Sequence, residues 1–367
     1  MGNMALNKAI LFSTLLFIPV VLSDDTVPAP GDKAQLNSWF EQNVQPLASR
    51  KDTLDPALVT AEANPRIIKL KSDGSGEFKT IADAINSIPN DNTNRIIISL
   101  GPGNYTEKIK IERNKPFISI IGDPNNLPTL VFDGTAAKYG TVESATLIVE
   151  SDYFNAANLI LANLAPRPNG DVKGAQALAV RIGGDKASFY NCKFLGFQDT
   201  LCDDKGKHLF KDCYIEGTVD FIFGNGKSIY LNVEMHVIPG DQQAWITAQA
   251  RHTDAEDTGY SFVHCKVTGT GRTAYLGRTW MPYGKVVFAY TDMSDAVIPA
   301  GWSNNFHPET EKTVLFGEFS STGPGSDTNN SRAAFTKKLS EAEVKPFLTL
   351  GFIEASKWLL PPTQVPA

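Results

Sequence analysis

A repeat of about 20 residues restricts the possible folds of this chain more than any other feature. Four segments place an aromatic residue three positions before a small or apolar residue and five before another apolar one: Phe189-x-x-Cys192-x-Phe194, Phe210-x-x-Cys213-x-Ile215, Tyr230-x-x-Val233-x-Met235 and, after a longer insertion, Phe262-x-x-Cys265-x-Val267. A fixed period of this length with β-type apolar alternation is typical of a solenoid whose coils stack on one another. We therefore predict an all-β solenoid built from short strands and turns.

Two aspartates occupy equivalent positions in consecutive repeats. Asp199 ends the segment Gly-Phe-Gln-Asp, and Asp220 follows 21 residues later in Gly-Thr-Val-Asp-Phe. Because stacked strands lie about 4.8 Å apart, we expect the two carboxyl groups to be within about 6 Å of each other. Gln198 precedes the first aspartate, and Gln176 lies 22 residues before Gln198. The repeat thus predicts two carboxylates and two amides on one small patch.

This combination of side chains indicates an active site. Two carboxylates at such a distance cannot both ionise cheaply, so one becomes an acid and the other a base or nucleophile. Glutamine amides can donate hydrogen bonds to a developing oxyanion. Arg278, in Leu-Gly-Arg-Thr-Trp, would hold one aspartate charged and oriented. Either aspartate alone would be read as a turn residue, but the matched phase favours catalysis by Asp199 and Asp220.

The N-terminus and the charge balance indicate a secreted protein. Residues 1–23 carry one positive charge, Lys8, before an apolar stretch, which predicts a cleaved signal peptide. No other segment approaches the length of a membrane span. The formal net charge of -6 becomes -7 without Lys8 and argues against nucleic acid as a partner. Secretion would make the sequons at Asn104 and Asn329 usable for glycosylation.

The rest of the chain divides into an extension and one large domain. Residues 24–66 are expected to be an N-terminal extension with a helix whose apolar face includes Trp39. Residues 67–367 are expected to be the catalytic domain, with strands to about residue 317 and a C-terminal tail. Ser340 opens a capping box there and predicts a helix. We expect the helical ends to pack onto the solenoid and to cover its edges.

Four cysteines are too few for a disulfide framework in a chain of this length. Cys192 and Cys213 share a repeat phase and could meet across adjacent coils, while Cys202 and Cys265 have no obvious partner. The composition favours four small buried hydrophobes. The five histidines show no metal-ligand spacing, so we expect neither a metal nor another cofactor.

Several ordered motifs resemble the plant pectin methylesterase family. They are Asp73-Gly-Ser-Gly-Glu-Phe-Lys-Thr80, Gly103-Asn-Tyr-Thr-Glu107, Ser144-Ala-Thr-Leu147, Gln176-Ala-Leu-Ala179, Gln198-Asp-Thr-Leu201, Asp220-Phe-Ile-Phe-Gly224 and Leu276-Gly-Arg-Thr-Trp280. The resemblance runs from about residue 67 to 302 and is weaker beyond. The chain is most similar to short, pollen-type members, since residues 24–66 are too few for the four-helix inhibitory pro-domain of longer ones.

The resemblance implies a right-handed parallel β-helix that hydrolyses the C6 methyl esters of homogalacturonan (pectin) and releases methanol. It implies that Asp220 is the nucleophile and that Asp199 is the acid and then the base. By the same resemblance, further functional positions are the oxyanion residues Gln176 and Gln198, the orienting residue Arg278, and the substrate contacts Thr146 and Trp280. A monomer in the plant cell wall is expected, and a four-helix inhibitor protein is a possible partner.

The chain departs from the family pattern at two positions. Thr279 replaces a proline that is usual between the arginine and the tryptophan, which leaves both functional side chains in place. Val233 stands where many relatives have the cysteine that pairs with the equivalent of Cys213, so that disulfide cannot form.

Two alternatives to an esterase remain open at this point. One is an enzyme that cleaves the pectin backbone, a lyase or a glycosidase, because those enzymes also use β-helices. A glycosidase also uses paired acids, about 5–9.5 Å apart. A lyase would need an acidic calcium cluster, which the sequence does not suggest. The other is a wall-binding solenoid without catalysis, which would be expected to have lost an acid or Arg278.

Overall fold

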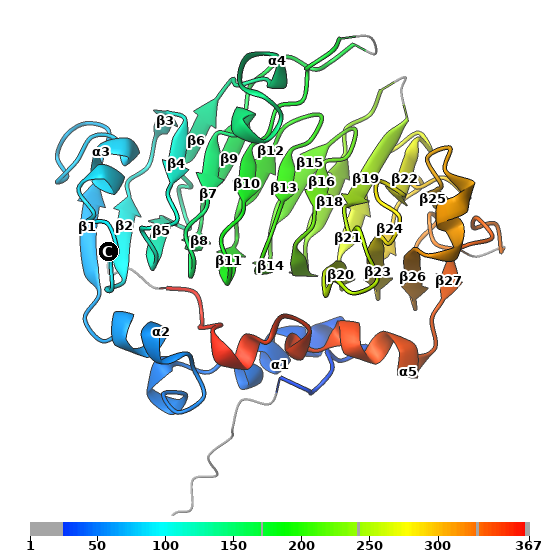
Figure 1. The fold of residues 1–367 in the computed structure, drawn as a ribbon, viewed down its shortest axis with the longest axis horizontal. Coiled ribbons are helices and arrows are strands. Elements are labelled where there is room, and N and C mark those ends of the chain that lie inside the picture. Colours follow the sequence, from blue (N-terminus) through cyan, green and yellow to red (C-terminus); the bar gives the residue numbers. More distant parts are fainter. Residues whose placement is uncertain (1–24, 170–171, 241–242, 328–329, 364–367) are drawn as a thin grey trace, which may run out of the picture.

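The structure is a computed structural model that describes residues 25–169, 172–240, 243–327 and 330–363. The predicted signal peptide and Asn329 lie outside the described residues, whereas Asn104 is exposed on a short strand. The described chain forms three sheets whose strands pair in parallel with the next coil (Figure 1). This arrangement is a parallel β-helix, as predicted.

The central coils contribute one strand to each sheet, and sheet I has further strands at its ends. Sheet I contains β1 (Arg66–Leu70), β2 (Ile96–Leu100), β5 (Ile118–Gly122), β8 (Asn155–Ala157), β11 (Ala187–Tyr190), β14 (Lys207–Lys211), β17 (Lys227–Leu231), β20 (Gly259–Val263), β23 (Lys285–Ala289), β26 (Leu315–Phe319) and β27 (Lys337–Lys338). Sheet II contains β4 (Ile109–Ile111), β7 (Leu147–Val149), β10 (Val180–Ile182), β13 (Leu201–Asp203), β16 (Ile222–Gly224), β19 (Ala244–Gln249), β22 (Ala274–Arg278) and β25 (Trp302–Ser303). Sheet III contains β3 (Asn104–Thr106), β6 (Thr129–Phe132), β9 (Ile160–Asn163), β12 (Lys193–Leu195), β15 (Tyr214–Gly217), β18 (Glu234–Val237), β21 (Lys266–Thr268) and β24 (Asp292–Met293).

The predicted repeat is the register of sheet I. Phe189, Phe210, Tyr230 and Phe262 are direct neighbours on consecutive strands, and Phe288 follows them on β23. Their rings stack inside the helix with centroids 5.2, 4.6, 4.4 and 4.5 Å apart. Rings spaced by the strand separation can stack nearly parallel, so one aromatic phase fills the interior over five coils.

The helices cover a face of the solenoid as well as one end. α1 (Leu36–Asn43), α2 (Pro56–Ala61) and α5 (Glu341–Val344) run below the strands of sheet I in Figure 1. Their apolar side chains pack on the outward residues of that sheet, such as Ile97 and Val287. The prediction that the helical ends pack onto the solenoid is confirmed, but the prediction that they cover its edges is wrong for these helices, because a two-sided apolar sheet needs a cover over its outer face. Among the helices of the described residues, α3 (Ile81–Asn86), capped by Thr80, packs into the interior near β1.

The two extensions hold each other against sheet I. The buried guanidinium of Arg50 donates to the carbonyl oxygens of Leu359, at 2.5 Å, and Ala355, at 3.2 Å. The Ala29 amide donates to Leu348 O at 2.8 Å. The predicted capping box at Ser340 is present at the start of α5. The N-terminal and C-terminal segments thus form one layer over sheet I.

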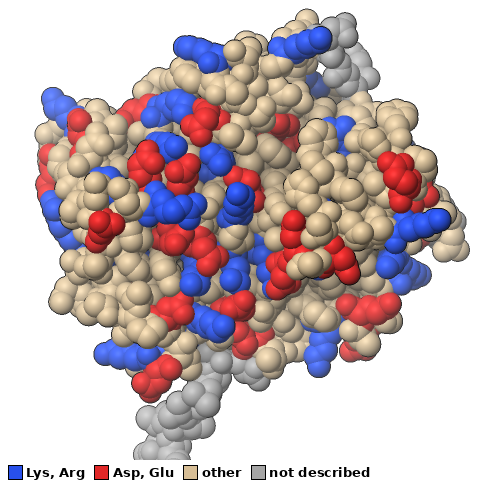
Figure 2. Space-filling model, in the orientation of Figure 1, with Lys and Arg blue, Asp and Glu red and all other residues tan. Residues whose placement is uncertain are grey.

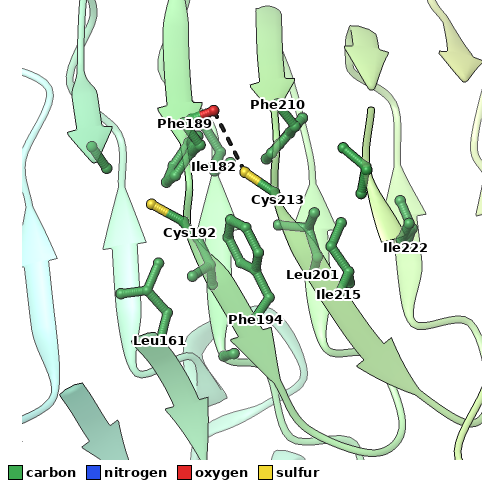
Figure 3. Close-up of a cluster of buried hydrophobic side chains, with 14 of the residues drawn as sticks. Leu161, Ile182, Phe189, Cys192, Phe194, Leu201, Phe210, Cys213, Ile215 and Ile222 are labelled. Atoms are coloured by element: carbon green, nitrogen blue, oxygen red, sulfur yellow. Dashed lines mark hydrogen bonds between the residues drawn. The ribbon is translucent and has the colours of Figure 1, made fainter. Parts of the chain in front are cut away.

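All four cysteines are buried and free. Figure 3 shows Cys192 and Cys213 among the interior side chains, where Cys213 Sγ contacts Phe189 O at 3.5 Å. This agrees with the prediction that the cysteines act as small hydrophobes. Val233 is buried in the same interior cluster.

Candidate active site

The predicted aspartates lie in the turns that lead from sheet III into sheet II. Each precedes its strand by two residues, and the register pairs Leu201 of β13 with Ile222 of β16. Asp199 N donates to Val219 O at 3.0 Å, which joins the two turns directly. Both aspartates have left-handed backbones, with φ of 66° and 49°. Aspartate tolerates this conformation better than most residues. Because both turns have it, the two aspartate side chains leave consecutive coils in the same direction.

Arg278, at the end of β22, clamps Asp220. Its Nε donates to Oδ1 at 2.8 Å and its Nη2 donates to Oδ2, so the pair is bidentate. The remaining Nη1 donates to Asn305 Oδ1 at 3.1 Å. A planar guanidinium with two bonds to one carboxylate fixes both the position and the charge of that carboxylate.

The two aspartates differ in their electrostatic surroundings although both are over 90 % buried. Burial raises the pKa of Asp220, and the Arg278 guanidinium opposes that rise. Burial raises the pKa of Asp199 well above its usual range, and the nearby charge of Asp220 raises it further. No hydrogen bond links the Asp199 carboxyl to another described residue. The proton of the pair is therefore favoured on Asp199, and the negative charge on Asp220.

The predicted glutamines lie side by side next to this pair. Ala177 N donates to Gln198 O at 3.2 Å, and Ala136 N donates to Gln176 O at 2.8 Å. Both glutamine side chains are half-buried. Among the described residues neither side-chain amide has a hydrogen-bond partner, so both are available to a ligand.

Thr146 does not reach the surface of the site. Its side chain is fully buried, and its hydroxyl donates to Ala162 O at 2.8 Å. Thr200 makes the same kind of bond to Glu216 O at 2.8 Å on a neighbouring coil. A threonine at this phase satisfies the carbonyl of a sheet III strand, in β9 for Thr146 and in β15 for Thr200, so the expected contact of Thr146 with substrate does not fit this structure.

Aromatic side chains lie around the ion pair between Arg278 and Asp220. The Arg278 guanidinium carbon lies 5.3 Å from the ring of Trp280, which is 49 % exposed, and 4.8 Å from the ring of Trp245. Phe306 is 96 % exposed in the loop that carries Asn305. Of these aromatic residues, only Trp280 was predicted from the sequence to belong to the site.

Two geometric signals mark the residues that were missed. The register pairs Ile222 with Thr247, which places Trp245 at the phase of Asp220 on the next coil. Phe306 has φ of 63°, unusual for a bulky residue. Its loop is anchored where Thr279 Oγ1 donates to Asn304 O at 2.6 Å. Both residues therefore adjoin the Arg-Thr-Trp segment.

Two other kinds of site are absent from the described ranges. No group of three or more His, Cys, Asp or Glu residues there has the arrangement of a metal site. No helix in the same part of the chain is long and apolar enough to cross a bilayer.

Comparison with known proteins identifies the family of this chain. The pectinesterase family model matches residues 68–356. The chain is 65% identical over 359 residues to Pectinesterase 1 of Olea europaea, and 64% identical over 359 residues to a pectinesterase of Parthenium hysterophorus; both alignments cover 98% of each chain. The solved pectin methylesterase from carrot superposes with a TM-score of 0.74 at 29% identity, over 81% of this chain and 95% of the carrot chain. The chain therefore belongs to the pectinesterase family and is a carboxylic ester hydrolase.

Proposed function

We propose that this chain hydrolyses the C6 methyl esters of homogalacturonan through an acyl-enzyme on Asp220. The Asp220 carboxylate attacks the ester carbonyl, and Asp199 gives its proton to the departing methoxide, which leaves as methanol. Asp199, now ionised, takes a proton from a water that attacks the acyl-enzyme. That step releases the galacturonate carboxyl, frees Asp220 and returns the proton to Asp199.

The contrast between the two aspartates carries this assignment. A nucleophile must be ionised, and the bidentate bond to Arg278 favours the ionised form of Asp220. An acid must be protonated, and burial beside a negative charge favours the protonated form of Asp199. The two roles therefore follow from one cation placed next to one of two equivalent carboxyls.

The surrounding residues fit the other needs of the reaction. The tetrahedral intermediate carries an oxyanion, and the unpaired amides of Gln176 and Gln198 are the donors proposed for it. The exposed indole of Trp280 offers an apolar face to a sugar ring. The reaction needs no cofactor, since every proton and bond is supplied by the two aspartates, the ester and water.

One assay separates ester hydrolysis from cleavage of the pectin backbone. The purified protein is incubated with methylated pectin, and methanol, unsaturated uronides and reducing ends are measured together. We expect methanol without either of the other products. Unsaturated uronides would indicate a lyase, and new reducing ends a glycosidase; either without methanol would contradict the proposal. Release of none of the three would indicate a binding protein.

We also propose that the protein acts as a secreted monomer in the plant cell wall. The relatives from Olea europaea and Parthenium hysterophorus are plant pectinesterases, which supports this location. We propose a four-helix inhibitor protein as a partner. Size-exclusion chromatography, alone and with such an inhibitor, tests the oligomeric state and the interaction, and a stable dimer of the enzyme alone would contradict the first.

A further inference from the structure

The turn that carries Asp220 is attached to Trp245 through the backbone. Trp245 N donates to Thr218 O at 3.0 Å, and Phe221 N donates to Trp245 O at 3.4 Å. These two bonds bracket the nucleophile on either side. Trp245 lies on β19, one coil beyond the turn, at the phase of Asp220 itself.

The side chain of Trp245 contacts Arg278, the residue that pairs with Asp220. The Arg278 guanidinium carbon lies 4.8 Å from the Trp245 ring, closer than its 5.3 Å distance from the Trp280 ring. The ring of Tyr275 stacks on that of Trp245, with the two centroids 5.9 Å apart and the two planes 8° from parallel. A guanidinium near aromatic rings is attracted to their faces and loses contact with water.

The indole N–H of Trp245 is not what holds this ring. Nε1 is buried and has no hydrogen-bond partner among the described residues. An orphaned buried donor costs stability, and a phenyl ring would avoid that cost. The position therefore uses the face of the ring, and the buried N–H is shielded from a polysaccharide outside.

We propose that Trp245 is a positioning residue, which holds the Arg278 guanidinium in the plane needed for its bidentate bond to Asp220. Trp280, half-exposed on the same cation, remains the face available to sugar. This inference rests on the proposed roles of Asp220 and Arg278. It adds a residue that acts on the nucleophile through Arg278.

The test compares Trp245→Leu with Trp245→Phe and Trp280→Leu on methylated pectin. Trp245→Leu removes the aromatic face, so we expect kcat to fall on the order of tenfold with KM little changed. Trp245→Phe keeps a face and is expected to retain most of kcat. Trp280→Leu is expected to raise KM. Equal losses in Trp245→Leu and Trp245→Phe with raised KM would overturn the proposal, since the N–H would then be what matters.

The pH profile gives a readout that a packing role alone would not change. Arg278 opposes the rise in the pKa of Asp220, so a loosened guanidinium lets that pKa rise further. The acid limb of kcat/KM should move to higher pH in Trp245→Leu and stay near the wild-type position in Trp245→Phe. A folded Trp245→Leu variant with wild-type kcat and an unmoved acid limb would exclude the positioning role.

Two further measurements keep the test decisive. If Trp245→Leu fails to fold, site-specific fluorination of the Trp245 indole keeps its shape but weakens the attraction to a cation, and kcat should fall as fluorines are added. An unchanged kcat would overturn the proposal. Asp220→Asn, measured alongside, separates the two hypotheses: activity in that variant refutes the proposed function and with it this inference. Inactivity of Asp220→Asn with unaffected Trp245 variants refutes the inference alone.

Discussion

Asp199 and Asp220 are the same residue in the same left-handed turn, yet one cation makes their surroundings different. Arg278 bonds to Asp220 and not to Asp199. Their adjacency could be predicted because the repeat between them is regular at 21 residues. Trp245 occupies the same phase one coil later, but a longer coil of 25 residues separates it from Asp220 and conceals that phase in the sequence.

The two aspartates should fail differently when each is changed to asparagine. Asp220→Asn removes the nucleophile, so methanol release from methylated pectin should fall to near background. Asp199→Asn removes an acid that contributes about 10²–10⁴-fold, and this loss should be partial on an activated aryl ester whose leaving group needs no proton. Arg278→Lys keeps the charge without the planar fork and should also lose most activity. Substantial de-esterification by Asp220→Asn would refute the assignment.

Phe306 should contribute to substrate binding rather than to chemistry. Its ring is fully presented to solvent by a strained loop next to Trp280, and strain of this kind concentrates at functional sites. Phe306→Ala should raise KM for pectin several-fold, since stacked ring contacts are worth about 0.5–1.5 kcal/mol, with little change in kcat. Ile67→Ala, at an exposed apolar residue on β1, is the control and should leave both unchanged. A Phe306→Ala variant with wild-type KM would contradict this role.

At the scale of elements, the strands were more predictable than the position of the helices. Runs such as that in β2, Ile96–Leu100, showed strands buried on one or both faces. The same runs do not reveal what covers the outer face. That cover joins α1 and α5, which are about 300 residues apart in the sequence, and local patterns carry no information on contacts of that range.

The aromatic stack of sheet I should be a main source of stability. Phe262 lies between Tyr230, at 4.4 Å, and Phe288, at 4.5 Å, and is fully buried. Phe262→Ala should lower the free energy of unfolding by about 3–5 kcal/mol, measured by denaturant titration. Phe262→Leu keeps apolar volume but loses ring stacking, so its loss should be smaller. The exposed Phe306→Ala variant serves as the matched control, and an equal loss there would contradict the argument.

A buried ion pair between His208 of β14 and Asp203 of β13 should make the free energy of unfolding depend on pH. His208 Nδ1 lies 2.5 Å from Asp203 Oδ1 and Nε2 lies 2.8 Å from Gly184 O, so both nitrogens face acceptors. Burial lowers the pKa of His208, but the Asp203 carboxylate outweighs it and the pKa is raised. The pair should stabilise the fold fully below about pH 6.5, the ordinary pKa of histidine. This stabilisation should be lost as the pH rises through the raised pKa of His208.

His208→Gln tests this sign. The difference in free energy of unfolding between wild type and His208→Gln should be largest at acidic pH and shrink as the solution becomes alkaline. His307 pairs with Glu309 on the surface, so His307→Gln is the control, with a small effect throughout. A difference that grew with pH would show that His208 is buried as the neutral form.

At the scale of the whole molecule, charge should govern retention on the acidic product. Without Lys8 of the predicted signal peptide the formal charge is -7. Figure 2 shows basic and acidic side chains intermixed on the displayed face. Arg181, for example, lies within 4 Å of carboxyl oxygens of Glu143, Glu150 and Asp204. Cations paired in this way offer little net attraction to a polyanion.

De-esterified pectin should therefore repel the protein at low salt. Added salt shortens the Debye length, which is about 8 Å at physiological ionic strength, so the repulsion should weaken as salt rises. The test uses a polygalacturonate column and the Asp220→Asn variant, which leaves the matrix unchanged, with fully methylated pectin as the uncharged control. Retention on polygalacturonate should stay constant or increase with salt. Elution by modest salt would contradict this prediction, because added salt releases a bound protein only where a net attraction between opposite charges holds it.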